Sequence, residues 1–391
     1  MSNKHRRTTA LEASTCDVIS SLPDELLHHI LSFTTAWEAV QTCVLSMRWL
    51  HVWQPLRRLS IEGHKFTSKI GFMEFMDNLL LRRGCIPLDS FRWTTTGSIY
   101  LNDDRASLCV SYALCCNVRE LEIVEHHHLL NLDHSYFTSA HLRILNLSGV
   151  SITDIFIERL FSGCPALEDL VMVDCHVLAT KFSSTTLKNL NTTSRSLNVY
   201  DYDDDFEDLV IDAPNLISLH LEDLPFLAPC LVNVSSLVTA YISLEEESFS
   251  NFDAKYSIVG ALSNATKLKL LSPVDNCDDY PSLLNKVLNR DLQRSQTFNN
   301  LKNCLLVVHL LGCSPIIQKL TLRLGLIGAS VSHQGTDESE AKKINCKHLK
   351  KVKIACVRGD TRVPNIVKVI LANAESLPEI VIKPYEHWWI M

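Results

Sequence analysis

Three consecutive histidines, His126, His127 and His128, are the residues of this sequence whose type best suits metal binding. Neighbouring side chains of an extended segment point to opposite faces, and no cysteine or carboxylate follows them closely at a ligand spacing. The 14 cysteines include no CxxC pair that would suit zinc. We therefore predict a solvent-exposed loop at the histidines, with no metal site and no cofactor.

Motifs for covalent chemistry are also missing from the sequence. It contains no glycine-rich phosphate loop, no GxSxG nucleophile motif and no HExxH zinc motif. A net charge of −7 argues against a nonspecific nucleic-acid binder. These observations favour a binding protein over an enzyme, and no nucleic acid is expected as a partner.

Length and composition indicate an ordinary globular chain. Its 391 residues, of which 46% are hydrophobic, suffice for two or three domains. No stretch suits a secretory signal or a membrane span, so we expect no membrane partner and a reducing, intracellular location in nucleus, cytoplasm or both. The cysteines then serve as small buried hydrophobes.

A repeated apolar pattern organises most of the chain. The pattern LxxLxL, with other aliphatic residues allowed, begins at Leu56, Leu88, Val118, Leu142, Leu167, Leu187, Leu216, Leu237, Ala265, Ile317, Leu349 and Leu377. Most steps fall near the 20–29 residues of leucine-rich repeats, although the pattern weakens at Leu187. The step from Ala265 to Ile317 contains either one degenerate copy or an insertion. We predict an α/β solenoid with parallel strands on its concave side and helices or loops outside.

Charged residues flank the apolar positions of several repeats. Because side chains alternate across a strand, these residues would line the concave surface: Glu120, Glu122, Asp169 and Glu222 in earlier copies, and Lys267, Lys269, Lys319, Arg323, Lys351, Lys353 and Lys383 in later ones. We expect a face that is acidic near the middle and basic toward the C-terminus. The candidate substrate-binding residues are Glu120, Glu122, Lys319, Arg323, Lys351 and Lys353, with an acidic or phosphorylated protein segment as ligand. The alternative is that the lysines only solubilise the edges.

Residues 16–53 follow a different, helical pattern. Pro23 and the carboxylates after it suit a helix start, and Thr35 with Glu38 forms the capping box of a second helix. Ser46 is expected to cap a third helix that carries Trp49 and Trp53 on one face. Three short helices bury little surface by themselves, so we expect exposed apolar side chains that another protein covers.

This N-terminal module resembles an F-box. The resemblance rests on the segment from Asp17 to Leu27, on Ile30-Leu31-Ser32-Phe33, on Val44-Leu45-Ser46, on Arg48-Trp49 and on Trp53. Phe161-Ser162-Gly163-Cys164-Pro165 is similar to a phrase that recurs in plant F-box/leucine-rich-repeat proteins, and residues 346–382 are similar to their FBD region. The chain departs from the family at Thr34-Thr35, at Met47 and at Leu50-His51-Val52.

The resemblance implies a non-catalytic receptor subunit of an SCF-type ubiquitin ligase. In that family the F-box binds a Skp-type adaptor, which connects it to a cullin and a RING protein, and the repeats hold a protein substrate for ubiquitination and degradation. By matching positions, the residues implied in adaptor contact or its immediate support are Leu22, Pro23, Leu26, Leu27, Ile30, Leu31, Val44, Leu45 and Trp49.

The expected organisation has four parts. Residues 1–15 form a flexible N-terminus, 16–62 the three-helix F-box, 63–345 the solenoid with insertions near 272–300 and 325–345, and 346–391 the FBD-like final repeats. The departures from the F-box pattern leave an alternative function open, namely a repeat-based interaction or scaffold protein whose degenerate F-box assembles no ligase.

Overall fold

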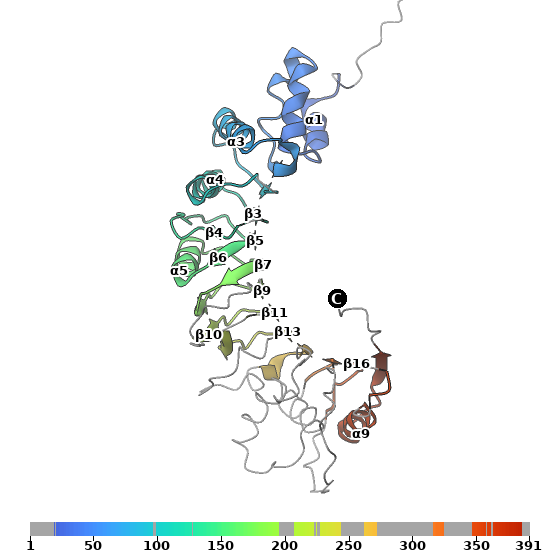
Figure 1. Cartoon of the computed structure of the whole chain (residues 1–391). Helices are drawn as coiled ribbons and strands as arrows, with labels where there is room; N and C mark the ends of the chain where they lie inside the picture. Colours follow the sequence, from blue (N-terminus) through green and yellow to red (C-terminus); the bar gives the residue numbers. More distant parts are fainter. Residues whose placement is uncertain are drawn as a thin grey trace, which may run out of the picture.

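A small helical module precedes a long curved sheet in the computed structural model of the chain (Figure 1). The structure describes residues 19, 21–96, 99–126, 128–194, 207–222, 224, 227–243, 262–271, 316–323, 346–356, 358–360 and 363–384. The predicted flexible N-terminus 1–15 and the predicted insertions near 272–300 and 325–345 lie outside these residues.

The concave side is a parallel sheet that confirms the predicted solenoid. The sheet has 14 strands, and twelve of them follow one another in the order β1-β2-β3-β5-β7-β9-β11-β13-β14-β15-β16-β17. Each of the twelve contains the second and third positions of one pattern copy: β1 (Arg58–Glu62), β2 (Ser90–Thr94), β3 (Glu120–Val124), β5 (Ile144–Ser148), β7 (Asp169–Val177), β9 (Asn189–Ser194), β11 (Ser218–Glu222), β13 (Thr239–Ser243), β14 (Lys267–Leu271), β15 (Lys319–Arg323), β16 (Lys351–Cys356) and β17 (Glu379–Pro384). The sheet thus begins at Arg58, inside the range 16–62 expected for the F-box.

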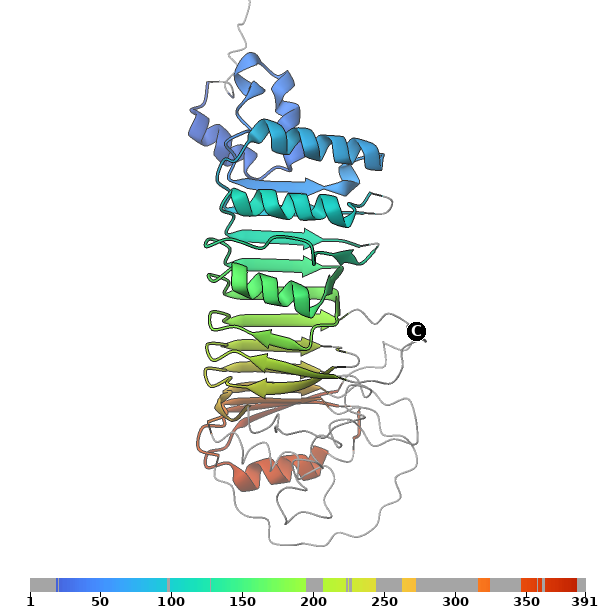
Figure 2. The same ribbon diagram turned by 90° about the vertical axis from the view of Figure 1, so that its left-hand side faces the viewer.

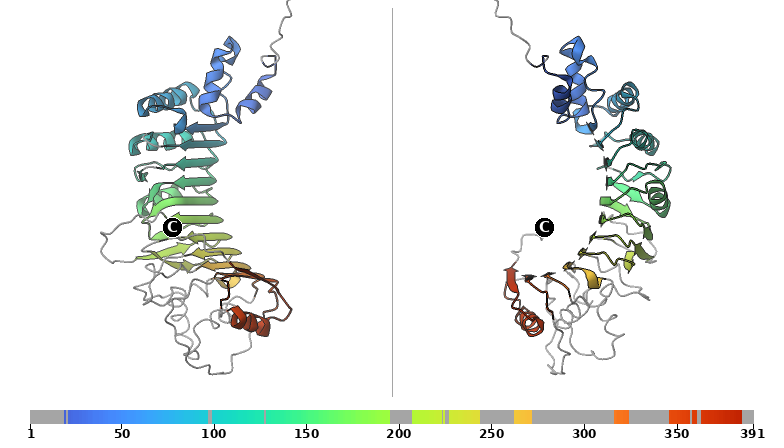
Figure 3. Two further views of the ribbon diagram at one scale, coloured as in Figure 1. Left: turned by 45° about the vertical axis from the view of Figure 1, so that its right-hand side comes forward. Right: turned by 180° about the vertical axis from the view of Figure 1, so that it is seen from behind.

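The chain returns between strands on the convex side (Figures 2 and 3). The returns near both ends are helices: α3 (Lys69–Arg83), α4 (Asp103–Cys115), α5 (Asp154–Gly163) and α9 (Val363–Asn373), with the short turns η3 (Gly63–Lys65) and η5 (Leu262–Asn264). Others are extended: β4 (Leu130–Asn131) and β6 (Val150–Ile152), and a second parallel sheet of β8 (Lys181–Ser183), β10 (Glu207–Asp212) and β12 (Leu227–Val232).

The longest step in the repeat, from Ala265 to Ile317, connects two neighbouring strands of the sheet. Strands β14 and β15 pair directly, with Lys267 opposite Lys319 and Leu268 opposite Leu320. Within the described sheet no strand therefore separates them, although 52 residues separate the two pattern copies at Ala265 and Ile317. Whether the step contains a degenerate copy or an insertion stays a prediction, because residues 272–315 lie outside the described residues.

Two inward-facing rows run through the twelve strands. The first row contains only apolar residues, from Leu59 through Leu190 to Ile380, because the register aligns the second position of every pattern copy. The second row runs from Ile61 to Ile382 and has one polar member, Thr192. Thr192 is buried, and its hydroxyl has no hydrogen-bond partner among the residues that the structure describes. This residue explains why the pattern weakens after Leu187.

Replacing Thr192 with valine is expected to stabilise the protein by about 1 kcal/mol, because valine has the same shape without an unsatisfied buried hydroxyl. Thr193→Val is the matched control, since the Thr193 hydroxyl accepts a hydrogen bond of 3.3 Å from the Asp174 N–H. Urea denaturation of the full chain should show a gain for Thr192→Val only. An equal gain in both variants would mean that the β-propensity of valine, and not removal of the unpaired hydroxyl, raises the free energy of unfolding.

A ladder of backbone hydrogen bonds joins the repeats where the strands begin. The carbonyl one residue before a strand accepts two N–H groups from the start of the next strand. The Arg119 carbonyl, for example, accepts from Arg143 N (2.9 Å) and Ile144 N (3.0 Å). The same arrangement recurs from Arg57 to Gln318. Each repeat is therefore held by its immediate neighbours.

Gly163 has a packing role within the phrase Phe161-Ser162-Gly163-Cys164-Pro165. A Cβ atom at this position would lie 1.5 Å from the Phe137 carbonyl oxygen. The Gly163 carbonyl also accepts a hydrogen bond of 2.9 Å from Ser139 N. The end of α5 thus approaches the backbone of the preceding repeat so closely that only glycine fits.

A buried arginine connects the helical module to the first repeat. Arg83, at the end of α3, is 2% exposed. Its guanidinium donates to the carbonyls of Leu56 (2.9 Å), Ile86 (2.6 Å) and Pro87 (3.1 Å), and to the hydroxyl of Tyr112 (3.0 Å). Leu56 precedes β1 and Tyr112 belongs to α4, so one side chain holds the start of the sheet and the first two convex helices together.

Candidate functional site

The N-terminal module consists of two α-helices and two 3-10 turns. They are α1 (Asp24–Leu31), α2 (Ala36–Gln41), η1 (Thr42–Val44) and η2 (Met47–Leu50). The predicted third helix follows Ser46 as the short 3-10 helix η2, but the predicted capping by the Ser46 side chain is wrong. Ser46 precedes only a 3-10 turn, its carbonyl and not its hydroxyl accepts Trp49 N (3.0 Å), and the buried hydroxyl has no partner.

The predicted capping box of α2 is confirmed and extends toward the repeats. The Thr35 hydroxyl accepts Glu38 N at 3.3 Å, and Glu38 Oε2 accepts Thr35 N at 3.0 Å. Lys65 Nζ lies 3.0 Å from Glu38 Oε1. The Thr35 N–H first, and Lys65 next, lower the pKa of Glu38 to about 2. The carboxylate thus stays charged while it links α2 to η3.

The residues matched to adaptor contact divide into buried and exposed groups. Leu27, Leu31 and Trp49 are buried and Leu22 is half-buried, so these four pack the module together. The other five are exposed: Pro23, Leu26, Ile30, Val44 and Leu45. Their role in adaptor binding stays a prediction.

Exposed apolar side chains gather in this module beyond the residues chosen from the sequence. Leu26 and Ile30 lie one turn apart on α1, and Phe33, Met47 and Leu50 are exposed as well. Arg48 brings the two ends of the module together, because it donates to the Leu22 carbonyl (2.5 Å) and to Asp24 Oδ1 (2.6 Å). We call Leu26, Ile30, Phe33, Val44, Leu45 and Met47 the N-terminal apolar surface. Its signal in the sequence was the density of large apolar residues in a module too small to bury them.

The candidate acidic residues of the concave face lie on β3. Glu120 is half-buried at the start of the strand, and Glu122 pairs with Arg92 of the neighbouring strand (3.4 Å). The other two residues expected on the acidic part, Asp169 and Glu222, lie on β7 and β11, so the four extend from the third to the seventh of the twelve strands.

A polar cluster that includes Glu222 lies in the middle of the concave face. The rings of His220 on β11 and Tyr241 on β13 stack with centroids 3.9 Å apart. One carboxylate joins them, because Glu222 lies 2.9 Å from His220 Nε2 and accepts the Tyr241 hydroxyl at 2.9 Å. The repeat pattern predicts Glu222 on the concave surface, but it does not predict the two rings beside it.

The candidate basic residues lie on β15 and β16. Lys319 is exposed at the start of β15, and Arg323 is the last residue of that strand. Lys351 on β16 pairs with both carboxylate oxygens of Glu379 on β17 (2.9 and 3.0 Å). Lys353 is half-buried. Lys351 is therefore already paired within the chain, which the sequence did not indicate.

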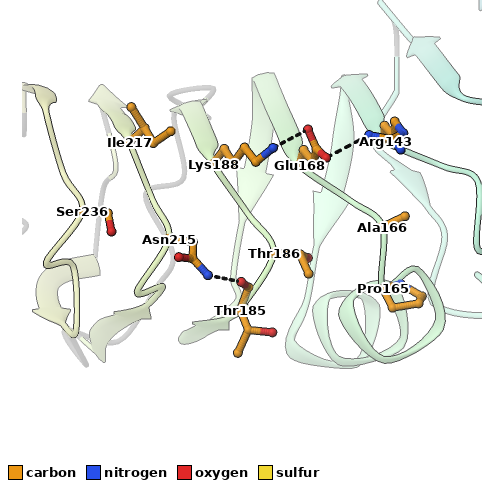
Figure 4. A pocket seen from close by; sticks show the side chains of 10 residues that line it. All are labelled: Arg143, Pro165, Ala166, Glu168, Thr185, Thr186, Lys188, Asn215, Ile217 and Ser236. Atoms are coloured by element: carbon orange, nitrogen blue, oxygen red, sulfur yellow. Dashed lines mark hydrogen bonds and ion pairs between the residues drawn. The ribbon is translucent and has the colours of Figure 1, made fainter.

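A shallow hollow of about 410 Å³ lies where the strands β7 to β13 begin (Figure 4). Glu168 lines the hollow and pairs with Arg143 (3.0 Å) and Lys188 (2.9 Å). Asn215 donates to the Thr185 carbonyl at 2.7 Å. The polar groups of this hollow thus bond to one another.

Among the described residues, no group of three or more His, Cys, Asp or Glu side chains could hold a metal ion. His128 lies 3.4 Å from the buried Glu125 and stacks edge-on against Tyr100. None of the described helices has the length and hydropathy that a membrane span requires.

A small module with exposed apolar residues, followed by a parallel-strand solenoid, defines a repeat-based binding protein. The F-box domain family matches residues 19–60, and the family described as At1g61320/AtMIF1, LRR domain, matches residues 112–388. The chain belongs to the proteins that combine an F-box with this leucine-rich-repeat domain.

Similar proteins from the plant Arabidopsis thaliana are named for the same domains. The chain is 29% identical over 292 residues to the F-box/LRR-repeat protein At4g14103. The aligned region covers 64% of this chain and 74% of that protein. It is 30% identical over 298 residues to the FBD-associated F-box protein At4g10400. That aligned region covers 66% of this chain and 67% of the relative.

Proposed function

We propose that this protein is the substrate-recognition subunit of an SCF-type ubiquitin ligase. The F-box binds a Skp-type adaptor, which leads to a cullin and a RING protein, and the repeats hold a protein substrate for ubiquitination and degradation in the nucleus or cytoplasm. The observation that carries the proposal is the N-terminal apolar surface, which lies within the matched F-box domain.

The physical argument starts from burial. Val44 is 87% exposed, and Leu26 and Ile30 are each about half exposed, although the module has a packed core of its own in Leu27, Leu31 and Trp49. Large apolar side chains that stay exposed together on one small module mark an interaction site. A mainly apolar contact with the adaptor removes these side chains from water.

The chain itself performs no covalent step in this proposal. It holds the substrate near the ubiquitin-charged enzyme, and this raises the effective concentration of the reacting groups. The joint at Arg83 supports that role, since a fixed orientation between F-box and repeats keeps the substrate in one place.

Co-purification with a Skp-type adaptor tests the proposal. We expect the full-length chain to form a stable 1:1 complex that survives size-exclusion chromatography. A folded chain that forms no such complex would contradict it and favour the alternative, a leucine-rich-repeat scaffold protein with a degenerate F-box. The departures from the F-box pattern at Met47 and at Leu50-His51-Val52 are the reason for testing that alternative.

A further inference from the structure

Lysines occupy the same position on three consecutive strands. The register places Lys267 of β14 opposite Lys319 of β15, and Lys319 opposite Lys351 of β16. Neighbouring strands lie about 4.8 Å apart, so the row spans about 10 Å. Like charges directly opposite each other destabilise a sheet. We call Lys267, Lys319 and Lys351 the lysine row.

The chain compensates only part of this charge. Lys351 pairs with Glu379 on the next strand. Lys267 and Lys319 are exposed and, among the described residues, neither makes an ion pair. Lys353 lies two residues beyond Lys351, on the same concave face, and likewise has no carboxylate within ion-pair distance in the described part of the chain.

The other end of the sheet is arranged differently. There, Arg92 on β2 pairs with Glu122 on β3 (3.4 Å), and Arg57 just before β1 pairs with Asp89 just before β2 (2.8 Å). The final repeats also carry excess positive charge, because residues 346–384 contain eight Lys and Arg and three Asp and Glu in a chain of net charge −7.

We propose that the lysine row, together with Lys353, binds an Asp/Glu-rich segment of the substrate protein. The inference rests on the proposed function, because it names the chemistry by which the repeats capture their substrate. A peptide in the polyproline II conformation that crosses the strands advances about 9 Å in three residues and returns to the same face. Acidic residues three apart therefore match the two ends of the row. Single positive charges spread along a line suit a run of carboxylates better than one concentrated phosphate. Binding also relieves the repulsion between the lysines.

Fluorescence anisotropy with the full-length chain in complex with its Skp-type adaptor tests this proposal. The probe is a labelled twelve-residue peptide with glutamate at every third position. Its control carries glutamine at those positions. We expect the glutamate peptide to bind, the glutamine peptide not to bind, and binding to weaken with added salt.

Two double variants separate the concave face from overall charge. Lys267→Glu/Lys319→Glu is expected to weaken peptide binding about tenfold or more. Lys347→Glu/Lys368→Glu makes the same change in net charge at two exposed positions outside the row, one of them on α9, and should change binding less than threefold. Both variants should bind the adaptor like the wild type, so failure of this inference is distinguishable from failure of the proposed function.

Three results would overturn the inference. They are no binding of the glutamate peptide by the wild type, an equal loss in both double variants, and tighter binding of a glutamine peptide that carries one phosphoserine. The last result would mean that the lysine row binds a phosphorylated segment and not an Asp/Glu-rich one.

Discussion

Replacing Leu45 with glutamate is expected to weaken adaptor binding about 100-fold or more without unfolding the protein. Leu45 is 63% exposed, so the carboxylate is solvated in the free chain and the module keeps its core of Leu27, Leu31 and Trp49. In the complex the same carboxylate would be buried in an apolar contact without a partner. Loss of one apolar anchor and burial of an unpaired charge together cost about 3 kcal/mol or more.

Leu108→Glu is the matched control. Leu108 is 68% exposed, but it lies on α4, outside the N-terminal apolar surface. We expect this variant to bind the adaptor with wild-type affinity in isothermal titration calorimetry, and circular dichroism should show that both variants are folded. Equal affinities of the Leu45 and Leu108 variants would exclude Leu45 from the contact.

The second large effect is expected at Arg83. Methionine at this position fills a similar volume but donates no hydrogen bond. The carbonyls of Leu56, Ile86 and Pro87 then lose a donor in a largely buried place. Each unsatisfied buried group costs about 1–3 kcal/mol, so the free energy of unfolding should fall by about 3 kcal/mol or more.

Arg82→Met provides the comparison, because Arg82 is the preceding residue of α3 and is exposed. Its effect should stay within about 0.5 kcal/mol. Urea denaturation followed by tryptophan fluorescence reports both values. If the two variants lose the same stability, the contribution at Arg83 is packing of the hydrocarbon chain or helix propensity and not the carbonyl contacts.

The strands could be predicted from the sequence because each one obeys a local rule. Two apolar residues spaced two apart must face the same side, and stacking then buries both. The convex returns follow no such rule. Whether a return forms a helix such as α5 or a strand such as β10 depends on packing against its neighbours, which local sequence does not encode.

The burial and pairing of the candidate site residues likewise depend on packing that local sequence does not encode. That Leu27 is buried while its neighbour Leu26 is exposed follows from how α1 packs within the module, although both residues fit the family pattern. The pairing of Lys351 with Glu379 joins residues 28 apart and becomes visible only through the register of β16 and β17. The stacked rings of His220 and Tyr241 meet for the same reason.

The hydrogen-bond ladder at the strand starts has a consequence for how the molecule opens. Since every rung bonds only to the next, opening spreads from the ends inward, as in a one-dimensional chain of coupled units. In the described twelve-strand path, β1 and β17 each have a neighbour on one side only, and the helical module covers the end at β1 (Figure 1). Amide protons of β17 should therefore exchange with solvent sooner than those of β7 or β9, and the final repeats become the fraying end of an otherwise slowly exchanging array.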